Sequence, residues 1–552
     1  MNNYIYDTDY PSNYMASESS RFRPASVFNG CPVFKRNSPF TVFGECPEDS
    51  LVSAELFKDG KCLCTATERS KPAACNRVYG KSEVFRLILP AQPQGYGYEL
   101  LITCITKGEF HTHRIKDICF GEVFVAGGQS NMEFELQNCT EGPEALRGES
   151  PDVRFYYTPK NHVFDAKFTE DENKASWMKF SKKNAKNWSA VGYFFARELS
   201  SKLGCPVGII GCNWGGTSAT AWMPYETIEF DSALKVYAED YKKAIGEKSK
   251  EEQKKEWEDY ITYNTKWQKK IDRIYKKNPK ASWDDALKKA GECKYPGPLN
   301  SFNPMRPSGL FETMLRRIVP YTVSGFIYYQ GESDDHRPEI YERLFGKLID
   351  SWRHLWNDES LPFFFVQLPM HRYIGDPDKK NWCIIRNAQT KVLQHKERTG
   401  MAVALDCGAY NDIHPKKKAE IGHRLALQAL SKLYGVIGEE EANSPIFDYC
   451  TQEGHTLILN FKNANLGFEL HESIPDGDPN PPEKINEACF EVSEDGINWV
   501  SVPFVTNGVQ IRLSSESIPN PRFVRYAYTN YGKVSVFSKN QLPLTPFECE
   551  IQ

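Results

Sequence analysis

The chain has 552 residues, of which 40% are hydrophobic and 13% aromatic, and its 68 lysine and arginine residues against 72 acidic residues leave a net charge of −4. This composition excludes a collagen, a disordered chain and a generally basic nucleic-acid-binding protein. No stretch approaches the roughly 20 apolar residues that cross a bilayer, so no membrane partner is expected. The length predicts about three or four domains.

The start of the chain and its cysteines predict where the protein works. The first residues, MNNYIYDTDYPSNY, contain neither the basic nor the apolar segment of a signal peptide. The 16 cysteines are scattered and form no C-x-x-C motif, which is typical of reduced thiols. We therefore predict a cytoplasmic protein. His111 and His113 would lie on one side of a strand, but their surroundings do not match a zinc-site pattern, so no metal is predicted.

The first 115 residues are predicted to form a β domain. Short apolar segments at 50–57, 82–89 and 98–106 are separated by Gly, Pro, Asn and Asp, which is typical of strands and turns. No helical period of comparable strength interrupts them. A β-sandwich or jelly roll is the simplest arrangement for residues 1–115.

After residue 115 the pattern changes to that of an α/β domain. Apolar runs without alternation, as in strands buried on both faces of a parallel sheet, occur at 122–128, 206–216, 324–331, 362–369 and 400–408. Helical patterns lie between or after them at 191–204, 341–356, 384–398 and 415–435. Strands that alternate with helices predict an α/β fold with a parallel sheet over residues 116–435.

A segment rich in lysine and glutamate at about 226–292 interrupts this alternation. Because its basic residues are interleaved with acidic ones, we expect a solvated helical hairpin and not a nucleic-acid-binding surface. In the alternative arrangement, its aromatic residues face inward and cover an active site. From residue 436 to residue 552 β-type segments return, with a hairpin turn expected at Asp495-Gly496, so a second β domain is predicted there.

Polar and glycine-rich motifs follow the predicted parallel strands. In open α/β sheets, ligands bind beyond the carboxyl ends of the strands. The motifs at these ends are GGQSNM at 127–132, GGTS at 215–218, QGESD at 330–334 and NDIHP at 411–415. A nucleophile, backbone donors, a side-chain amide and a histidine are therefore expected at one edge of the sheet.

Ser130 is the predicted nucleophile. The glycines before it allow a sharp turn from strand into helix, which leaves its hydroxyl at the helix N-terminus beside free backbone N–H groups. For this residue alone, an ordinary N-cap serine is the alternative. The motif is not the G-x-S-x-G of α/β-hydrolases, because Met132 stands where the second glycine belongs.

Further hydrogen-bond donors are predicted for the oxyanion that a serine esterase generates. Gly215 and Gly216 follow a strand directly and allow a backbone N–H to approach a ligand closely, with a tight turn as their alternative role. Gln330 offers a side-chain amide at another strand end, and a buried structural amide is its alternative role.

His414 is the predicted general base. Pro415 suits the first position of a helix, so His414 is expected at the N-cap, where the positive helix end keeps the imidazole neutral. A general base needs that neutral state. A surface or capping histidine is the alternative.

Asp412 is the predicted acid that orients His414. It lies two residues before the histidine, whereas a D-x-x-H spacing would need an acid at position 411, which is Asn. If Asp412 points away, the alternative partners of His414 are another carboxylate, with Glu332 and Asp334 as candidates, or a backbone carbonyl. A Ser–His dyad with weak support from Asp412 is the remaining alternative.

Four motifs taken together resemble one family. AGGQSNMEFEL, GGTSATAW, YYQGESD and DIHP are similar, in order and spacing over about residues 117–430, to blocks of the sialate O-acetylesterase family within the SGNH (GDSL-like) hydrolases. The flanks are similar as well, so the resemblance covers nearly the whole chain. It implies a flavodoxin-like, three-layer α/β/α domain between two β-sandwich-type regions, and removal of acetyl groups from sugars without a cofactor.

The resemblance also implies residue roles. Ser130 matches the nucleophile and His414 the base, and Gly216, in preference to Gly215, matches the glycine donor. Many SGNH hydrolases have Asn where this chain has its QGE block, so donation by Gln330 is an inference. Substrate contacts are predicted for Gln129, Asn131, Gly215, Trp214, Trp222, Glu332 and Arg386. Stacking on sugar rings, with core packing as the alternative, is predicted for Trp214, Trp222, Tyr328, Tyr329 and Trp382.

The predicted function is that of a serine carboxylic-ester hydrolase. It would remove O-acetyl groups from acetylated oligosaccharides or O-acetyl sialic acid through an acetyl-enzyme. The alternatives are an esterase of non-sugar esters and a catalytically inactive carbohydrate-binding protein. A homo-oligomer is compatible with the sequence.

Overall fold

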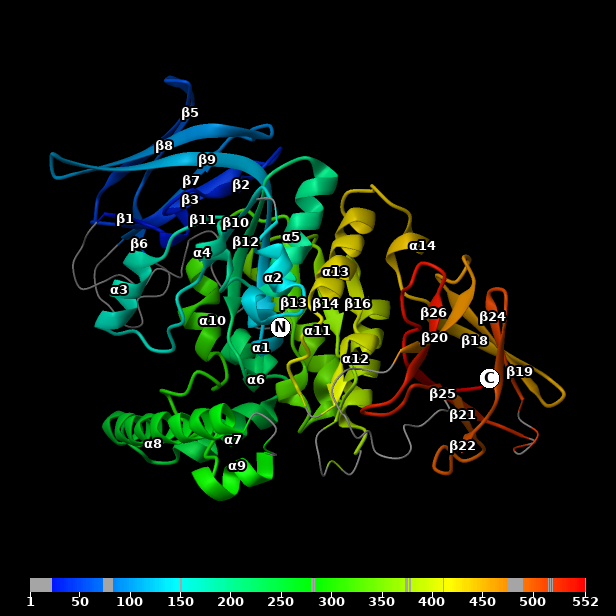
Figure 1. Cartoon of the computed structure of the whole chain (residues 1–552). Coiled ribbons are helices and arrows are strands. Elements are labelled where there is room, and N and C mark those ends of the chain that lie inside the picture. The colour runs from blue at the N-terminus through cyan, green and yellow to red at the C-terminus, as the bar shows by residue number, and fades with distance from the viewer. Residues whose placement is uncertain are drawn as a thin grey trace.

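The computed structural model describes residues 22–72, 83–148, 151–278, 281, 283–372, 376, 379–410, 412–473, 490–514, 516, 518 and 520–551. Its centre is a sheet with the strand order β11-β10-β12-β9-β13-β14-β16 (Figure 1). Every neighbouring pair from β10 to β16 is parallel, whereas β11 joins the edge in the antiparallel direction. The predicted α/β fold is confirmed. The strands are β9 (Glu109–Gly128), β10 (Val153–Tyr157), β11 (Met178–Lys179), β12 (Val207–Asn213), β13 (Gly325–Tyr329), β14 (Phe363–Gln367) and β16 (Thr399–Val403).

The central strand β9 marks the point where the chain changes direction across the sheet. Val125 of β9 pairs with Ile210 of β12 on one side and with Phe326 of β13 on the other. The chain fills the β10 and β12 side first and then returns to add β13, β14 and β16. Ligands bind in open α/β sheets at such a switch point, beyond the carboxyl ends of the strands.

Strand β10 is a part of the sheet that the sequence pattern does not indicate. Its sequence, VRFYY, contains an arginine although the strand is largely buried. Arg154 is accommodated because its guanidinium donates to the backbone oxygens of Cys31 and Asp117. A buried charged side chain with such partners is tolerated in a strand. Because the arginine interrupts the apolar run, the sequence pattern does not indicate this strand.

The predicted helices form with small shifts of their ends. They are α5 (Ala190–Leu203), α11 (Tyr341–Leu355), α12 (Asn381–His395) and α13 (Ala419–Lys432). Helix α5 begins where the side chain of Ser189 accepts the N–H of Gly192, and it ends at Gly204 in the left-handed conformation. Helices α5 and α13 pack against each other, as do α11 and α12.

The N-terminal region consists of strands, as predicted. Strands β1 (Arg23–Pro24), β3 (Phe40–Cys46), β7 (Glu83–Leu89) and β6 (Lys71–Pro72) form one sheet. A second group is continuous with β9 and contains β2 (Val33–Lys35), β4 (Leu51–Lys58), β5 (Lys61–Arg69) and β8 (Gly95–Thr106). The first part of β9 pairs with β8, and its last part pairs with β12 and β13. This single strand therefore crosses the predicted domain boundary at residues 115 and 116.

The C-terminal region begins with the short helix α14 (Glu439–Ala442) and continues as strands (Figure 1). The predicted turn at Asp495-Gly496 connects two strands that pair in the antiparallel direction, and Gly496 has a φ of +73°. One sheet contains β18 (Ile446–Glu453), β19 (Thr456–Lys462), β24 (Gln510–Ser514) and β23 (Phe504–Asn507). A second contains β22 (Val500–Ser501), β21 (Phe490–Ser493), β25 (Phe523–Tyr526) and β27 (Phe547–Glu550), and β20 (Phe468–Ser473) pairs with β26 (Val534–Ser538).

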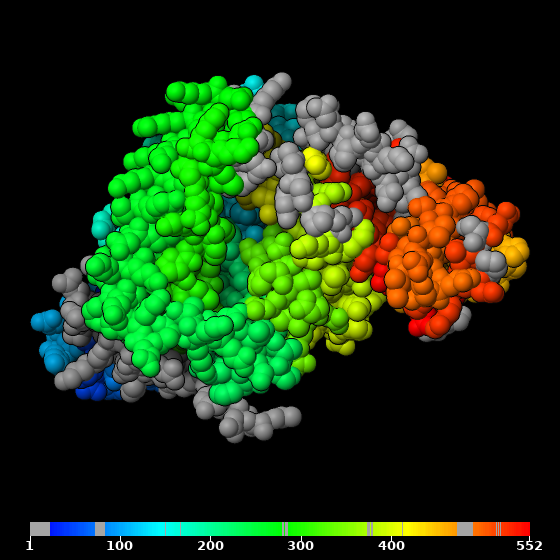
Figure 2. All heavy atoms as spheres, turned by 90° about the horizontal axis from the view of Figure 1, so that it is seen from below, coloured from blue at the N-terminus to red at the C-terminus, as the bar shows by residue number. Residues whose placement is uncertain are grey.

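The lysine-rich insertion is helical. Its helices are α6 (Tyr225–Glu229), α7 (Lys235–Ile245), α8 (Lys250–Lys277) and α9 (Trp283–Ala290). Helices α8 and α9 share a small separate core of Trp267, Ile271, Ala286 and Ala290. Seen from below, the green surface of the insertion and the yellow-green surface of later residues border a hollow in the molecule (Figure 2). The insertion is therefore solvated and also borders this hollow.

Candidate active site

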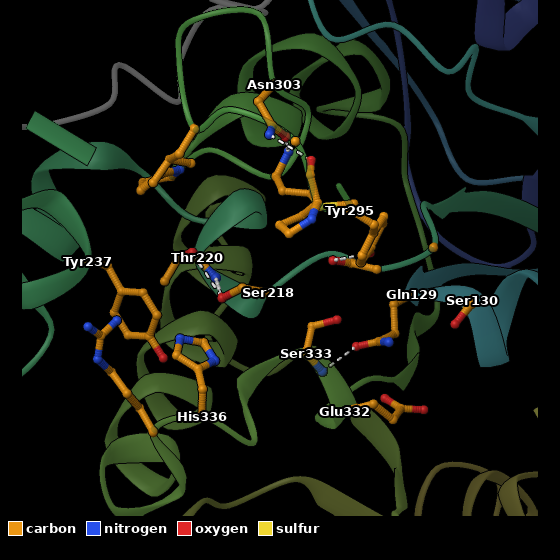
Figure 3. Close-up of a pocket in the computed structure, with 18 of the residues that line it drawn as sticks. Gln129, Ser130, Ser218, Thr220, Tyr237, Tyr295, Asn303, Glu332, Ser333 and His336 are labelled. Carbon is orange, nitrogen blue, oxygen red and sulfur yellow. Dashed lines mark hydrogen bonds between the residues drawn. The ribbon is translucent and has the colours of Figure 1, made fainter. Parts of the chain in front are cut away.

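A cavity of about 810 Å³ lies at the carboxyl ends of β9, β12 and β13. Figure 3 shows Ser130 at one end of this cavity and Tyr237 with His336 at the other. The walls come from the strand ends, from α7 and from the segment after α9. The lining residues are Gln129, Ser130, Gly215, Gly216, Ser218, Thr220, Tyr237, Asp240, Tyr295, Pro296, Gly297, Leu299, Asn303, Met305, Pro307, Glu332, Ser333, His336, Arg337, Ile413 and His414.

Ser130 occupies the sharp turn between β9 and the short helix α1 (Ser130–Glu133). Gly128 makes this turn with a φ of +127°, and a Cβ there would lie 2.2 Å from the carbonyl oxygen of Tyr329. Only glycine fits such a backbone. As the first residue of α1, Ser130 also presents a backbone N–H that the helix itself does not use.

His414 lies directly against Ser130. Its Nε2 is 2.8 Å from Ser130 Oγ, although 284 residues separate the two in sequence. Burial lowers the pKa of His414, and the positive charge of Lys418 lowers it further, while Asp412 and Glu133 act in the opposite direction. The imidazole is therefore neutral at neutral pH and can accept the serine proton.

The predicted helix cap at His414 is wrong. Helix α13 begins at Ala419, five residues after the histidine, so no helix end acts on the imidazole. The segment before the helix instead turns so that Lys418 enters the interior, where its side chain is fully buried. The neutral histidine that we predicted is present, but burial and the Lys418 charge are its causes.

Asp412 lies next to His414 but binds its backbone. Asp412 Oδ1 accepts the backbone N–H of His414 at 2.9 Å. Within the described part of the chain, the ring of His414 makes a hydrogen bond to Ser130 and to no other residue. Asp412 therefore fixes the loop that carries the base and contributes a nearby negative charge.

The two glycines after β12 differ in their surroundings. The backbone N–H of Gly215 donates to Glu133 Oε2 at 2.8 Å, so it is already occupied. Gly216 has a φ of +76°, and a Cβ there would lie 1.7 Å from the hydroxyl oxygen of Tyr295. Both line the cavity, but Gly216 is the one whose N–H has no acceptor among the described residues. The geometry thus favours Gly216 as the donor, as predicted.

The predicted donation from Gln330 to an oxyanion does not agree with the structure. The Gln330 amide nitrogen donates to Asp334 Oδ2 at 2.6 Å and to the carbonyl oxygen of Thr217 at 3.3 Å, which uses both of its hydrogens. The side chain is buried and is absent from the cavity wall. Its alternative role, a structural amide, matches this environment.

Asp334 connects three parts of the site. Besides Gln330, its carboxylate accepts the hydroxyl of Ser218 at 2.6 Å, the backbone N–H of Ala219 at 2.9 Å and the hydroxyl of Tyr237 at 3.2 Å. The segment after β12, the segment after β13 and helix α7 therefore meet at one buried carboxylate. It contacts neither His414 nor Ser130, so it is not the orienting acid.

Asn131 is buried behind the cavity and does not reach it. Its amide nitrogen donates to Glu332 Oε1 at 2.6 Å and to the carbonyl oxygen of Ile413 at 2.9 Å. Its Oδ1 accepts Lys418 Nζ at 2.6 Å. The predicted substrate contact of Asn131 is therefore wrong, because every polar atom of this side chain is used to hold the residues around Ser130 and His414.

The remaining predicted contacts divide between the cavity wall and the core. Gln129, Gly215 and Glu332 line the cavity, and Gln129 Oε1 accepts the backbone N–H of Ser333 (Figure 3). Trp214 lies outside the wall, beside Lys160 and His162. The predicted contacts or stacking roles of five residues are wrong because their side chains are buried in the core: Trp222, Tyr328, Tyr329, Trp382 and Arg386. Arg386 instead donates to the carbonyl oxygens of Pro369 and Thr529.

Several residues of the cavity wall were not predicted from the sequence. Tyr237 and Asp240 come from α7, and Tyr295 comes from the segment after α9. The alternative that aromatic residues of the insertion face an active site agrees with the position of Tyr237. His336 and Arg337 follow the QGESD motif closely, but no spacing rule distinguishes them from ordinary loop residues.

No described group of three or more His, Cys, Asp or Glu side chains has the arrangement of a metal site. Among the helices that the structure describes, none has the length and apolar character needed to cross a membrane.

Comparisons with known proteins show what the chain is similar to. Residues 298–431 match the model of the family "Carbohydrate esterase, sialic acid-specific acetylesterase". Sialate O-acetylesterase of Mus musculus is 24% identical over 85% of each chain, and that of Rattus norvegicus is 23% identical over 86% of this chain and 85% of its own. A crystal structure of a carbohydrate acetylesterase from Xanthomonas citri, 24% identical, superposes with a TM-score of 0.69 and covers 96% of this chain and 99% of its own. The resemblance to the sialate O-acetylesterase family that the sequence motifs indicate is therefore confirmed.

Proposed function

We propose that this protein is a carbohydrate O-acetylesterase that removes acetyl groups from sugars through an acetyl-enzyme on Ser130. The observation that carries the proposal is the distance of 2.8 Å between His414 Nε2 and Ser130 Oγ at the end of an open cavity. A nucleophile and a base within hydrogen-bond reach are the signature of covalent catalysis. The match to carbohydrate esterases gives the bond that is attacked, an acetyl ester of a sugar.

In the first step, Ser130 Oγ attacks the acetyl carbonyl carbon while His414 Nε2 takes the hydroxyl proton. The negative charge that develops on the carbonyl oxygen is stabilised by the backbone N–H groups of Ser130 and Gly216. Each such donor is worth about 3 kcal/mol of transition-state stabilisation. The tetrahedral intermediate then expels the sugar oxygen, which receives the proton from His414.

In the second step, water hydrolyses the acetyl-enzyme. His414 takes a proton from the water as its oxygen attacks the acetyl carbon, and the same N–H groups hold the new oxyanion. Expulsion of Ser130 Oγ, with return of the proton from His414, releases acetate and restores the enzyme. The catalytic core of the proposal is thus a Ser130–His414 pair, which Asp412 supports by fixing the backbone and by its charge.

The proposal includes the finer architecture and the location of the protein. The parallel sheet with its two helix pairs would be a three-layer α/β/α, flavodoxin-like unit, and the strand regions on either side would be β-sandwiches. The division at residues 1–115, 116–435 and 436–552 stays a prediction, as does the cytoplasm as the place of action. Fractionation of the native host, with the protein found mainly outside the cytoplasm, would contradict the location.

The test is acetate release from a panel of esters. We expect release from acetylated oligosaccharides and little from long-chain lipid esters or thioesters, because the chain is similar to carbohydrate esterases and side chains that can bind sugar hydroxyls, among them Gln129, Ser333 and His336, line the cavity. Preference for a lipid ester or a thioester would favour the alternative esterase. Binding of the sugars without acetate release would favour an inactive carbohydrate-binding protein.

A further inference from the structure

We propose that the natural substrate is an acetylated sugar without a carboxylate, an inference that rests on the proposed acetylesterase function. The basis is the charge of the cavity wall. Among the described residues that form it, Arg337 is the one lysine or arginine, whereas Asp240 and Glu332 are acidic. The carboxylate of a sugar such as a sialic acid is bound most strongly by a cation that is free to pair with it.

Arg337 is already engaged by groups of the protein. Its Nη2 lies 2.5 Å from Asp240 Oδ2, and its guanidinium lies over the ring of Tyr237, 4.9 Å from the ring centre. Tyr237 is itself fixed, because its hydroxyl donates to the buried Asp334. The ion pair is therefore held in place at the far end of the cavity, and its net charge is zero.

The cations behind the wall are engaged as well. Lys418 donates to Asn131 Oδ1 at 2.6 Å, and its side chain is fully buried. Arg306 donates to the carbonyl oxygens of Asn303 and His162 at 2.9 Å each. Neither side chain belongs to the cavity wall, so neither is placed to meet a substrate carboxylate.

Glu332 adds a buried carboxyl group to the cavity wall, and burial raises its pKa. Its side chain lines the cavity although it is only 4% exposed, and one oxygen, Oε1, accepts the Asn131 amide. The other, Oε2, is buried and has no hydrogen-bond partner. This carboxyl group offers no positive charge to a substrate carboxylate. The described part of the wall is therefore suited to neutral, hydroxyl-bearing sugars, because its one arginine is already paired.

The test compares two substrates that differ only in charge. O-acetyl N-acetylneuraminic acid and its carboxyl methyl ester carry the same acetyl group, and acetate is the product measured from both. We expect the wild-type kcat/KM to be at least about tenfold higher for the methyl ester, because the free acid meets no unpaired cation. A neutral acetylated oligosaccharide is expected to be cleaved as well.

Asp240→Asn tests whether the ion pair causes this preference. The change releases Arg337, so the ratio of the two kcat/KM values should fall by several-fold, mainly through a lower KM for the free acid. Arg337→Met should instead preserve or increase the ratio, since it leaves Asp240 as an unpaired negative charge. Glu239→Gln is the matched control, because Glu239 lies on the same helix, is exposed and is absent from the wall.

The outcomes separate this inference from the proposed function. Equal or faster cleavage of the free acid by the wild type would overturn the inference and leave the acetylesterase intact. An unchanged ratio in Asp240→Asn would overturn the role of the ion pair. Failure to release acetate from the free acid, the methyl ester and the oligosaccharide would defeat the proposed function itself.

Discussion

Lys418 Nζ donates a hydrogen bond of 2.6 Å to Asn131 Oδ1, which joins the helix of the nucleophile to the segment after the base. Asn131 in turn donates to the carbonyl oxygen of Ile413, the neighbour of His414. Neither Lys418 nor Asn131 touches the cavity. They are positioning residues: they lie outside the cavity wall and fix the distance between Ser130 and His414.

Removal of the Lys418 charge should change the pH dependence of the enzyme. Burial lowers the pKa of Lys418 to about 7, so the side chain is charged in the acidic range and there lowers the pKa of His414. In Lys418→Met the pKa of His414 rises, and the acid limb of kcat/KM moves to higher pH. We also expect kcat to fall by about tenfold through loss of positioning.

Lys416→Met is the matched control for this change, because Lys416 is an exposed lysine two residues away. The acid limb of its kcat/KM profile should lie at the same pH as that of the wild type. A Lys418→Met enzyme whose activity falls with an unmoved acid limb would show that the lysine acts through packing and not through its charge.

Asp412→Asn should shift the acid limb in the opposite direction. The carboxylate raises the pKa of His414, so its neutralisation lowers that pKa and extends activity to lower pH. Because Asp412 binds the backbone N–H of His414 and Asn retains an acceptor oxygen, we expect only about a tenfold loss of kcat. A loss of about 10⁴, as in triads whose acid binds Nδ1, would contradict this account. The pH profile of kcat/KM provides the measurement.

Gly216→Ala should abolish most activity, because a side chain does not fit at position 216. A methyl group would collide with Tyr295, and the φ of +76° disfavours any side chain. We expect a loss of about 10²–10³ in kcat, the amount associated with one oxyanion donor. Gly204→Ala imposes a similar left-handed strain at an open helix end, and its activity should remain at the wild-type level. Restoration of activity by adding Tyr295→Ala would show that the collision alone is responsible.

Asp334→Ala should destabilise the fold, because it leaves the donors of Ser218, Gln330 and Tyr237 without their shared acceptor. Loss of a buried, hydrogen-bonded carboxylate costs about 3 kcal/mol. The midpoint of thermal unfolding should fall by several degrees, whereas the exposed Glu339→Gln should leave it unchanged. An unaltered midpoint in Asp334→Ala would contradict the assigned role.

Five of the parallel strands, and the meeting of Ser130 with His414 at one edge of the sheet, could be predicted because both follow local rules. An apolar run that ends in glycines marks a buried strand, and residues after such runs meet at one edge. Helix α5, predicted at 191–204, forms between Ser189 and Gly204. Strand β10 was not predicted, because Arg154 interrupts its apolar pattern.

The parts of the site that the sequence did not indicate depend on tertiary contacts. Whether the Gln330 amide faces the cavity or Asp334 depends on where α7 and the β12 loop pack, which no spacing reveals. Trp222 and Arg386 share residue types with sugar-binding sites, yet both are buried. Tyr295 lies against Gly216 although 79 residues separate the two in sequence.

The most direct test of the account is acetate release by Ser130→Ala from an acetylated oligosaccharide that the wild type cleaves. If Ser130 is the nucleophile, kcat falls by about 10⁴ or more, since the acetyl-enzyme cannot form. Ser351→Ala, which changes a half-buried serine of α11 outside the cavity wall, should match the wild type. Acetate release by Ser130→Ala at a rate near that of the wild type would contradict the assignment of Ser130 as the nucleophile.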